Sequence, residues 1–420
     1  MIASGQQGPT IALIDEEFPW PTNSGKRLRT MNLVQRLAGS HRLIYVAHRN
    51  ACATELSQAR QHLESLGVET LEVPRRIQPK SGPAFYARLA GNLRSPLPYS
   101  VSSHYSDEMR DRLEQLNRER SIDLWHCEWT PYVELFRHLE FQPLVVAAHN
   151  VESQIWDRYA AEESNPLKRW YIRLQHRKFE QFERWAFQRA GQIIAVSDDD
   201  ARLARQQFGA NQVEVVQNGV DLQRYRHNDQ PRRQYEMIFL GSLDWRPNLH
   251  GMQTFLKTTL PKIAHQEPRA RLTIVGRNPP AWLRQRAERD DRIELHANVD
   301  DVVPWLSRAG LMIVPLQIGG GSRLKIIESA ANRLPVVSTT VGAEGLQFVP
   351  DRDYLSADSI DAMDRPVIEA MHYPETARQI ADNAYRIVQR VYDWDGLARQ
   401  QAEIWATAVN PSRDPRSASA

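Results

Sequence analysis

Short apolar runs alternate along the chain with longer segments in which apolar residues recur every three or four positions. Short runs are typical of buried parallel strands, and the wider spacing is typical of helices that cover a sheet. In the first half, the expected strands occupy residues 10–15, 42–47, 68–73, 122–126, 144–148, 192–196 and 213–216. The first expected helix occupies residues 25–38. The alternation predicts a parallel α/β sheet with helices on both faces.

The same alternation begins again after residues 222–234, a polar segment that contains Pro231 and is typical of a linker. In the second half, the expected strands occupy residues 236–240, 271–275, 292–295, 311–315 and 335–338. Residues 376–408 then form a long helical region with few helix breakers. The sequence therefore predicts an α/β fold with two Rossmann-like, doubly wound parallel sheets, and ligands at the carboxyl ends of the strands.

Composition narrows the class of protein. The chain has 420 residues, of which 41% are hydrophobic and 25% charged, and its net charge is +2. Such values are typical of a globular protein and do not suggest nucleic acid as a partner. The chain has only two cysteines, Cys52 and Cys127, so we expect no disulfide framework. We expect a cytoplasmic location instead. We expect no signal peptide and no membrane-spanning helix.

Residues 318–328 combine glycines, cations and a carboxylate directly after an expected strand. Glycines let a ligand approach the backbone, and the start of the following helix presents free N–H groups to an anion. Arg323 and Lys325 add two positive charges, and Glu328 lies about one turn further along, where its carboxylate can accept hydrogen bonds from ribose. The alternative is a solvated glycine turn. The predicted diphosphate-ribose site contains Gly319, Gly320, Gly321, Ser322, Arg323, Lys325 and Glu328.

This segment, and RLKIIESAANRLPVVSTTVGAEGL from Arg323 onward, resembles glycosyltransferase family 4, the retaining GT-B enzymes. The resemblance is nearest to a bacterial subgroup associated with exopolysaccharide synthesis. It implies two Rossmann-like domains that face each other across a cleft. It also places Glu328 on the nucleotide ribose. Gly320 occupies the position of the family's first Glu, which contacts the donor sugar, so the resemblance does not identify that sugar.

The resemblance extends the donor site to other loops that follow strands. The further donor-binding residues that it implies are Ser242, Arg246, Asn248, Gly276, Arg277 and Val299. The family usually has Arg and Lys where this chain has Ser242 and Asn248. Arg246, or Arg323 with Lys325, is expected to hold the diphosphate instead. Each loop has a structural alternative as a plain turn.

In the first half, the candidate residues lie at the ends of expected strands or in the segments that follow them. They are Gly25, His126, Glu128, His149 and Asn150. Gly25 begins the helix after the first strand and could approach the donor phosphates. The resemblance implies that His149 contacts the donor sugar near the reaction centre. His126, Glu128 and Asn150 are expected on the acceptor side. A structural role is the alternative for each of them.

The resemblance also implies a division of the chain. We expect an N-terminal acceptor domain at residues 1–225 and a C-terminal donor domain at residues 226–385. A helix at residues 386–408 would cross back to the N-terminal domain, and residues 409–420 would form a flexible tail.

We expect no cofactor and no metal ion. The acidic run at residues 198–200 follows Ser197 and is typical of a capped helix start rather than of a metal site. Charge on the departing diphosphate would be stabilised by Arg323, Lys325 and backbone N–H groups. His149 would orient the sugar. By resemblance, the reaction retains the anomeric configuration.

Two segments mix basic and aromatic residues, at residues 75–94 and 166–190. Such a pattern is typical of helices on an anionic membrane surface, and it also occurs in core-facing helices with solvated arginines. The predicted function is transfer of a hexose-type sugar from a nucleotide-diphosphate sugar to a glycan or lipid-linked acceptor. The protein would work in the cytoplasm, at the inner face of the membrane if these helices bind lipid. A GT-B sugar-nucleotide epimerase and a non-catalytic nucleotide-sugar-binding protein are the alternatives.

Overall fold

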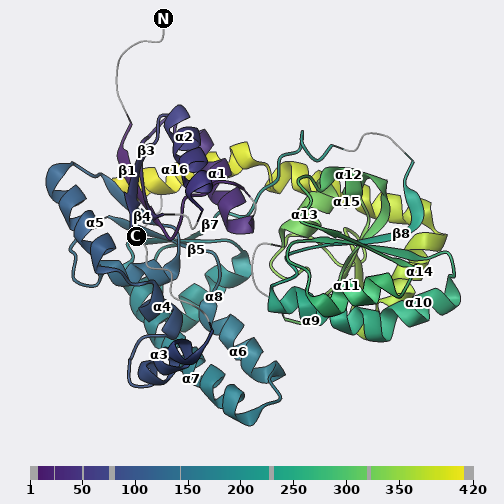
Figure 1. The fold of residues 1–420 in the computed structure, drawn as a ribbon. Helices are drawn as coiled ribbons and strands as arrows, with labels where there is room; N and C mark the ends of the chain where they lie inside the picture. Colours follow the sequence, from purple (N-terminus) through teal and green to yellow (C-terminus); the bar gives the residue numbers. More distant parts are fainter. Residues whose placement is uncertain are drawn as a thin grey trace, which may run out of the picture. The chain divides into compact units, whose positions relative to one another are not determined.

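The chain forms two compact units, each with its own parallel sheet and apolar core (Figure 1). The computed structural model describes residues 8–22, 24–49, 52–74, 81–141, 143–226, 231–318 and 323–410. Within these, unit 1 contains residues 8–217 and 395–410, and unit 2 contains residues 218–318 and 323–394. No helix among the described residues is long and apolar enough to span a bilayer.

Unit 1 contains a seven-stranded sheet in the order β3-β2-β1-β4-β5-β6-β7. Its strands are β1 (Thr10–Asp15), β2 (Arg42–His48), β3 (Glu69–Val73), β4 (Leu124–Cys127), β5 (Leu144–Ala148), β6 (Gln192–Ala195) and β7 (Val213–Val215). Its helices are α1 (Gly25–Leu37), α2 (Ala53–Ser65), α3 (Pro83–Asn92), α4 (Tyr99–His104), α5 (Asp107–Glu119), the 3₁₀ helix η1 (Thr130–Phe136), α6 (Glu152–Glu162), α7 (Pro166–Arg189) and α8 (Asp198–Phe208). All seven strands were expected from the sequence.

Unit 2 contains a six-stranded parallel sheet in the order β10-β9-β8-β11-β12-β13. Its strands are β8 (Arg233–Leu240), β9 (Arg271–Gly276), β10 (Ile293–Ala297), β11 (Ala309–Val314), β12 (Val336–Thr339) and β13 (Leu355–Ala357). Its helical elements are α9 (Arg246–Thr254), the π-helix η2 (Phe255–Thr259), α10 (Leu260–Gln266), α11 (Ala281–Glu288), α12 (Val303–Arg308), α13 (Leu324–Ala331), the 3₁₀ helix η3 (Ile360–Ala362), α14 (Asp364–His372) and α15 (Pro374–Val391). The last helix, α16 (Trp394–Val409), belongs to unit 1 from Asp395 onward.

The strand order fixes where a ligand can bind in each unit. The winding of the sheet reverses between β1 and β4 in unit 1 and between β8 and β11 in unit 2. At such a point the two flanking loops leave the sheet in opposite directions, and they open a crevice at the carboxyl ends of the strands. In β1, Ile14 lies opposite Val46 of β2 and Cys127 of β4, so the loops after these strands start at one level.

The structure differs from the expected helical region 376–408. That region is interrupted between α15 and α16, because the backbone there pairs with a distant segment. Val220 N donates to Tyr392 O (2.9 Å), and Val220 forms a bridge with Asp393. The three-residue strand β13 was also not expected. The acidic run after Ser197 is the predicted helix start, since Ser197 Oγ accepts from Asp200 N (3.1 Å).

Candidate functional site

The clearest cluster of polar side chains in unit 2 lies on the carboxyl edge of its sheet. It is formed by the loops after β8 and β9 and by the first turns of α9 and α13. Helix α13 forms where the sequence predicts it, with Ile326, Ile327 and Ala330 buried. That apolar face points Lys325 and Glu328, which are three residues apart, away from the core on a common side of the helix.

Lys325 is held by a neutral partner. Its Nζ donates to Asn248 Oδ1 (2.9 Å) and lies 4.5 Å from the centre of the Phe239 ring. Asn248 is buried, and its Nδ2 donates to Ser242 O (2.9 Å), so the amide cannot turn without losing a bond. A Cβ atom on Gly241 would lie 2.7 Å from Asn248 Nδ2 and 3.0 Å from Lys325 Nζ, so only glycine leaves room for this pair.

The environment of Lys325 weakens its charge. Burial and the nearby guanidinium of Arg323 lower its pKa to about 7, against an opposing effect of Glu328. Desolvation disfavours the ammonium form because Asn248 supplies a dipole but no negative charge. Lys325 is therefore a cation site whose charge is incompletely balanced within the protein, which is what an anionic ligand needs.

A second network joins the loops after β8, β9 and β10. Ser242 Oγ donates to Asp244 Oδ1 (2.8 Å) and accepts from Arg277 Nη2 (3.1 Å). Asn278 donates from Nδ2 to Asp244 Oδ2 (2.9 Å) and from its backbone N to Asn298 Oδ1 (3.2 Å). Two of the predicted donor residues, Ser242 and Arg277, are thus brought together, and they are linked to the loop that contains Val299.

The other predicted residues of these loops have different environments. Arg246 is exposed at the first position of α9, and Val299 is partly buried against an apolar cluster of unit 2. Gly276 has a packing role, since a Cβ atom there would lie 2.1 Å from Gly241 O and 2.8 Å from Leu243 Cγ. The predicted residues Gly319, Gly320, Gly321 and Ser322 lie outside the described residues.

Arg323 is already engaged within unit 2. It is only 7% exposed, and its Nη2 donates to Val341 O (2.9 Å) and lies 3.5 Å from Glu344 Oε2. Its backbone is left-handed, with a φ of 47°, which costs a residue other than glycine about 1–2 kcal/mol. These contacts to the loop after β12 hold Arg323 in that conformation. The predicted direct contact with a diphosphate is therefore better supported for Lys325 than for Arg323.

Glu328 has a partner that the sequence did not indicate. Tyr225 OH donates to Glu328 Oε1 (2.7 Å), across 103 positions of the chain. Burial raises the pKa of Glu328, while the hydrogen bond from Tyr225 and the charges of Arg224 and Lys325 oppose that rise. The carboxylate is thus fixed beside Lys325 on the same face of α13.

In unit 1, the polar cluster lies at the carboxyl ends of β1, β4 and β5. Glu128 has its two carboxylate oxygens 3.2 Å from His126 Nε2 and 3.3 Å from His149 Nε2. Burial raises the pKa of Glu128, but the adjacent rings of His126 and His149 outweigh it and keep that pKa well below its ordinary value. Burial lowers the pKa of His149, so its ring is neutral at neutral pH. Asn150 is the next residue after His149 and is partly buried.

The predicted acceptor-side role needs a correction for two of these residues. His126 is fully buried, because the indole of Trp405 in α16 covers it and donates from Nε1 to His126 Nδ1 (3.0 Å). Glu128 is only 2% exposed. Neither side chain can touch an acceptor directly. Glu128 can act through His149, whose side chain is 12% exposed.

A buried ion pair lies beside this cluster. Lys26 in α1 pairs with Asp15 at the end of β1, and Tyr45 OH donates to the other oxygen of Asp15 (2.7 Å). Burial raises the pKa of Asp15 to about 6, although Lys26 lowers it. Gly25, predicted to approach the donor, is the first residue of α1. Among the described residues, no group of three His, Cys, Asp or Glu side chains is arranged to hold a metal ion.

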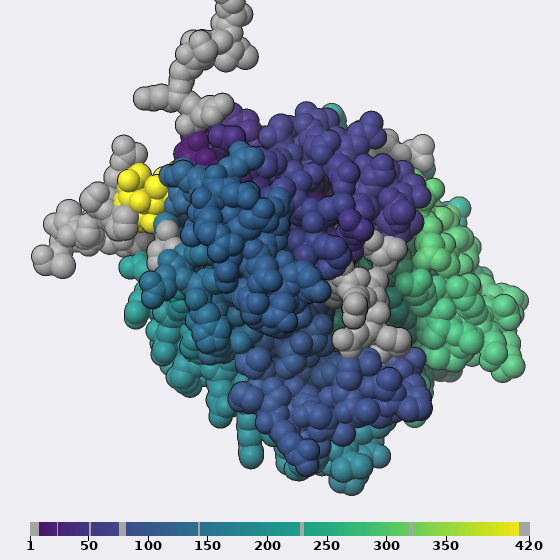
Figure 2. Space-filling model, turned by 60° about the vertical axis from the view of Figure 1, so that its left-hand side comes forward, coloured from purple at the N-terminus to yellow at the C-terminus, as the bar shows by residue number. Residues whose placement is uncertain are grey.

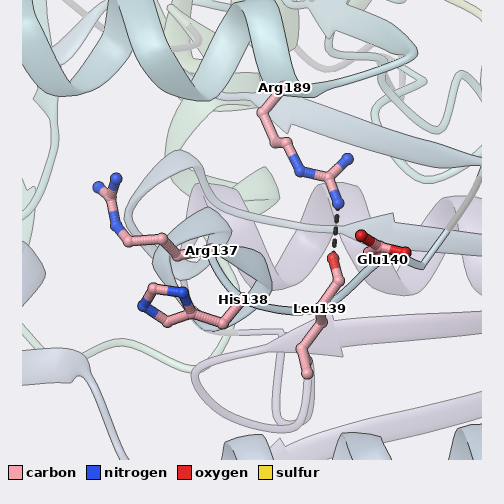
Figure 3. A pocket seen from close by; sticks show the side chains of 5 residues that line it. All are labelled: Arg137, His138, Leu139, Glu140 and Arg189. Atoms are coloured by element: carbon pink, nitrogen blue, oxygen red, sulfur yellow. Dashed lines mark hydrogen bonds between the residues drawn. The ribbon is translucent and has the colours of Figure 1, made fainter.

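A surface hollow of about 570 Å³ in unit 1 lies away from these residues (Figure 3). It is lined by Arg137, His138, Leu139, Glu140 and Arg189. Arg189 Nη2 donates to Leu139 O (2.6 Å). The lining segments directly precede β5 and β6, so the hollow lies at the amino ends of the strands. It is therefore on the opposite edge of the sheet from the candidate residues.

The predicted amphipathic segment 166–190 is helix α7, and most of its aromatic residues face the core. Phe179, Phe182 and Phe187 are buried, whereas Trp170 is 53% exposed. The core-facing alternative is thus correct for the carboxyl-terminal half of α7, and only its first turns remain exposed. Of the segment 75–94, residues 75–80 lie outside the described residues, and α3 covers most of the rest.

Comparison with a solved structure identifies the fold. The chain matches the fold of Anabaena Alr3699/HepE in complex with UDP with a TM-score of 0.67 and 14% identity, over 95% of this chain and 100% of the other. Two α/β units, each with its own parallel sheet, together with this likeness, define the GT-B fold.

Two family models identify the chain as a glycosyltransferase. Residues 28–224 match the model described as Glycosyltransferase Family 4, and residues 234–371 match the model described as Glycosyl transferases group 1. The chain belongs to glycosyltransferase family 4.

Two relatives are similar over most of their length. An uncharacterised 44.6 kDa protein in the cps region of Klebsiella pneumoniae is 20% identical over 91% of this chain and 96% of its own. The GDP-mannose:cellobiosyl-diphosphopolyprenol alpha-mannosyltransferase of Xanthomonas campestris is 24% identical over 70% of this chain and 76% of its own.

Proposed function

We propose that this glycosyltransferase moves a hexose from a nucleotide-diphosphate sugar to a glycan or lipid-linked acceptor, with retention of the anomeric configuration, in bacterial polysaccharide or glycoconjugate synthesis. The observation that carries the proposal is the Lys325–Asn248 pair beside Glu328 and Ser242 on the carboxyl edge of unit 2. The names of the relatives support it, since the Xanthomonas enzyme uses GDP-mannose and a polyprenol-linked acceptor.

The chemistry follows from where charge develops. When the anomeric C–O bond breaks, its electron pair goes to the diphosphate, which gains a negative charge. The ammonium of Lys325 and the positive end of the α13 dipole can stabilise that charge without a metal ion. The acceptor oxygen enters on the face that the diphosphate leaves, and the departing phosphate oxygen takes the acceptor's proton. His149, neutral and oriented by Glu128, would contact the sugar.

A binding screen and a transfer assay test this proposal. UDP-, GDP-, ADP- and dTDP-sugars would be tested by thermal shift, because a ligand that binds the native state raises its melting temperature. The donor that binds would then be incubated with polyprenol-diphosphate-linked sugars in the presence of EDTA. We expect transfer to continue in EDTA, with the anomeric configuration retained in the product. If no nucleotide sugar shifts the melting temperature, or if transfer stops in EDTA, the proposal is wrong.

A lipid-linked acceptor requires contact with a membrane, and unit 1 has a surface suited to it. Four large apolar side chains are exposed on α3, directly after it and on the start of α7, at 67% for Tyr86, 41% for Leu93, 73% for Leu167 and 53% for Trp170. The exposed cations of the same segments are Arg94, Lys168 and Arg173. We call these seven residues the α3/α7 surface, and we propose that it binds anionic lipid at the inner face of the membrane.

Contacts between the two helices show that the end of α3 lies beside the middle of α7. Gln175 Nε2 in α7 donates to Asn92 Oδ1 at the end of α3 (3.1 Å), and Lys178 Nζ donates to Asn92 O. Figures 1 and 2 show α3 beside α7 in two views. Isolated apolar side chains are ordinary on a protein surface, but four large ones on two adjoining helices, together with cations, form an interfacial pattern.

Vesicle sedimentation tests the membrane contact. The protein should sediment with vesicles of phosphatidylglycerol and phosphatidylcholine, less so as salt increases, and not with phosphatidylcholine alone. The double variant Leu167→Ala/Trp170→Ala should lose most of this binding. Trp282→Ala, which removes an exposed tryptophan from unit 2, is the matched control and should bind like the wild type. Equal sedimentation of both variants would exclude the α3/α7 surface.

A further inference from the structure

One contact in unit 2 has no role in the proposed chemistry and yet fixes a residue of the donor site. Tyr225 lies in the segment of unit 2 that precedes β8 and is only 4% exposed. Its ring packs in an apolar cluster with Ile327 and Ala331 of α13, and its carbonyl accepts from Asn332 Nδ2 (3.0 Å). The ring is thus held in place independently of its hydroxyl.

The hydroxyl of Tyr225 has a specific partner. It donates its proton to Glu328 Oε1 at 2.7 Å. Burial and the charge of Glu328 raise the pKa of Tyr225, so the hydroxyl stays protonated and remains a donor. Among the residues that the structure describes, this is the one hydrogen bond that the Glu328 carboxylate accepts. One carboxylate oxygen is therefore engaged, and this bond restrains the side chain of Glu328.

We propose that Tyr225 is a positioning residue that makes the donor site selective for ribonucleotides over 2′-deoxyribonucleotides. This inference rests on the proposed function, in which Glu328 accepts hydrogen bonds from the ribose. A carboxylate that accepts from a ribose hydroxyl rejects a sugar without it, because its oxygen is then desolvated and left unpaired. Such rejection is strong only if the carboxylate cannot swing away to water. The bond from Tyr225 supplies that restraint.

The charge around Glu328 is consistent with this role. The groups that face it are the Tyr225 hydroxyl, Arg224 of the same segment and Lys325 one turn away on α13. Both cations favour the ionised, acceptor-only form of Glu328. Ionised Glu328 can accept a hydrogen bond from a ribose hydroxyl, whereas a protonated carboxyl would lose part of that capacity.

The experiment compares pairs of nucleotides that differ at one atom. Dissociation constants would be measured by calorimetry for UDP, GDP or ADP, whichever binds the wild type most tightly, and for its 2′-deoxy form. We expect the wild type to prefer the ribonucleotide by about tenfold or more, the amount that one hydrogen bond to a charged acceptor supplies. In Tyr225→Phe this ratio should fall to about two- to threefold, while the ring and its packing remain.

Two further variants make the outcome decisive. Tyr392→Phe is the matched control, because it removes another buried hydroxyl of the same apolar cluster, one that accepts from Gln347 N (2.8 Å). Its ratio should equal that of the wild type. Glu328→Gln should also lose the preference. In this variant a neutral amide replaces the charged acceptor, so the hydrogen bond with the ribose hydroxyl is weaker.

Each result either supports or overturns the assignment. A lowered ratio in Tyr225→Phe and Glu328→Gln, with an unchanged ratio in Tyr392→Phe, supports it. An unchanged ratio in Tyr225→Phe, or an equal fall in Tyr392→Phe, overturns it while leaving the proposed function intact. If Tyr225→Phe does not fold, an unchanged ratio in Glu328→Gln overturns it. If the wild type binds none of the nucleotides, the proposed function itself fails.

Discussion

Binding of a nucleoside diphosphate should add a proton to Lys325. In the free protein, burial and Arg323 lower the pKa of Lys325 to about 7, so at pH 8 only about one tenth of the side chain is charged. A diphosphate beside Nζ replaces the neutral oxygen of Asn248 with negative charge, and this raises the pKa of Lys325 well above 8. Binding at pH 8 should therefore take up about 0.9 proton per site.

Calorimetry in several buffers measures this uptake. The apparent enthalpy of binding, plotted against the ionisation enthalpy of the buffer, has the number of exchanged protons as its slope. At pH 8 the slope should correspond to about 0.9 proton. At pH 6, where about nine tenths of Lys325 is already charged, the uptake in excess of that in Lys325→Arg should fall to about 0.1 proton. UDP, GDP or ADP is a suitable ligand at pH 8, since its terminal phosphate is then ionised.

Lys325→Arg is the control, because a guanidinium keeps its charge at both pH values. This variant should bind the nucleotide at pH 8 without proton uptake. If the wild type takes up no more protons at pH 8 than Lys325→Arg does, or as many at pH 6 as at pH 8, then Lys325 does not meet the diphosphate as proposed.

Three predictions concern stability. The pKa of Lys325 is lower in the folded than in the unfolded state, so its charge destabilises the fold below pH 7. Lys325→Met should therefore raise the free energy of unfolding of unit 2, measured in urea at pH 6, by about 1–3 kcal/mol. This gain should shrink as the pH rises above 7. A gain that is independent of pH would contradict this. Gly276→Ala should destabilise unit 2 by about 1–3 kcal/mol, because its methyl group overlaps Gly241 O; a neutral effect would show that this loop can move. Trp405→Phe should cost unit 1 about 1–3 kcal/mol, because His126 Nδ1 loses its donor, and urea unfolding followed by a probe in unit 1 measures it.

The sheets could be predicted from the sequence because their strands are continuous apolar runs. The run at residues 144–148 is fully buried as β5, as a strand covered on both faces should be. The break between α15 and α16 could not be predicted. It depends on Val220, about 170 positions away, whose backbone pairs with that of Tyr392 and Asp393. A local pattern contains no information about such a pairing.

The candidate site, like the fold, could be predicted in part. Parallel strands end on a common edge, so a polar residue directly after a strand could be assigned to that edge, as Ser242 and His149 were. What the sequence did not indicate are the partners from distant elements. Tyr225 reaches Glu328 and Trp405 reaches His126 across more than one hundred positions. His126 also shows that the accessibility of a polar residue within a strand cannot be predicted from the pattern alone. The pattern does not say whether another element covers that face of the sheet.

The two predicted cations of the donor site should contribute differently to turnover. Arg323 already has a carbonyl and a carboxylate beside it, and a new negative charge would compete with Glu344 for it. Lys325 is hydrogen-bonded to a neutral amide rather than to a carboxylate, so its interaction strengthens most as the diphosphate gains charge. Catalysis depends on interactions that are stronger in the transition state than with bound substrate. Lys325→Ala should therefore lower kcat on the order of 100-fold.

Arg323→Ala should instead act mainly on the loop that Arg323 holds. It removes the bond to Val341 O and the contact with Glu344, so it should lower the melting temperature and raise KM, with a smaller effect on kcat than Lys325→Ala. Steady-state kinetics with saturating acceptor would separate the two parameters. An equal loss of kcat in both variants would mean that Arg323 leaves Glu344 when the donor binds and meets the diphosphate itself, because only a group that touches the developing charge can contribute as much as Lys325.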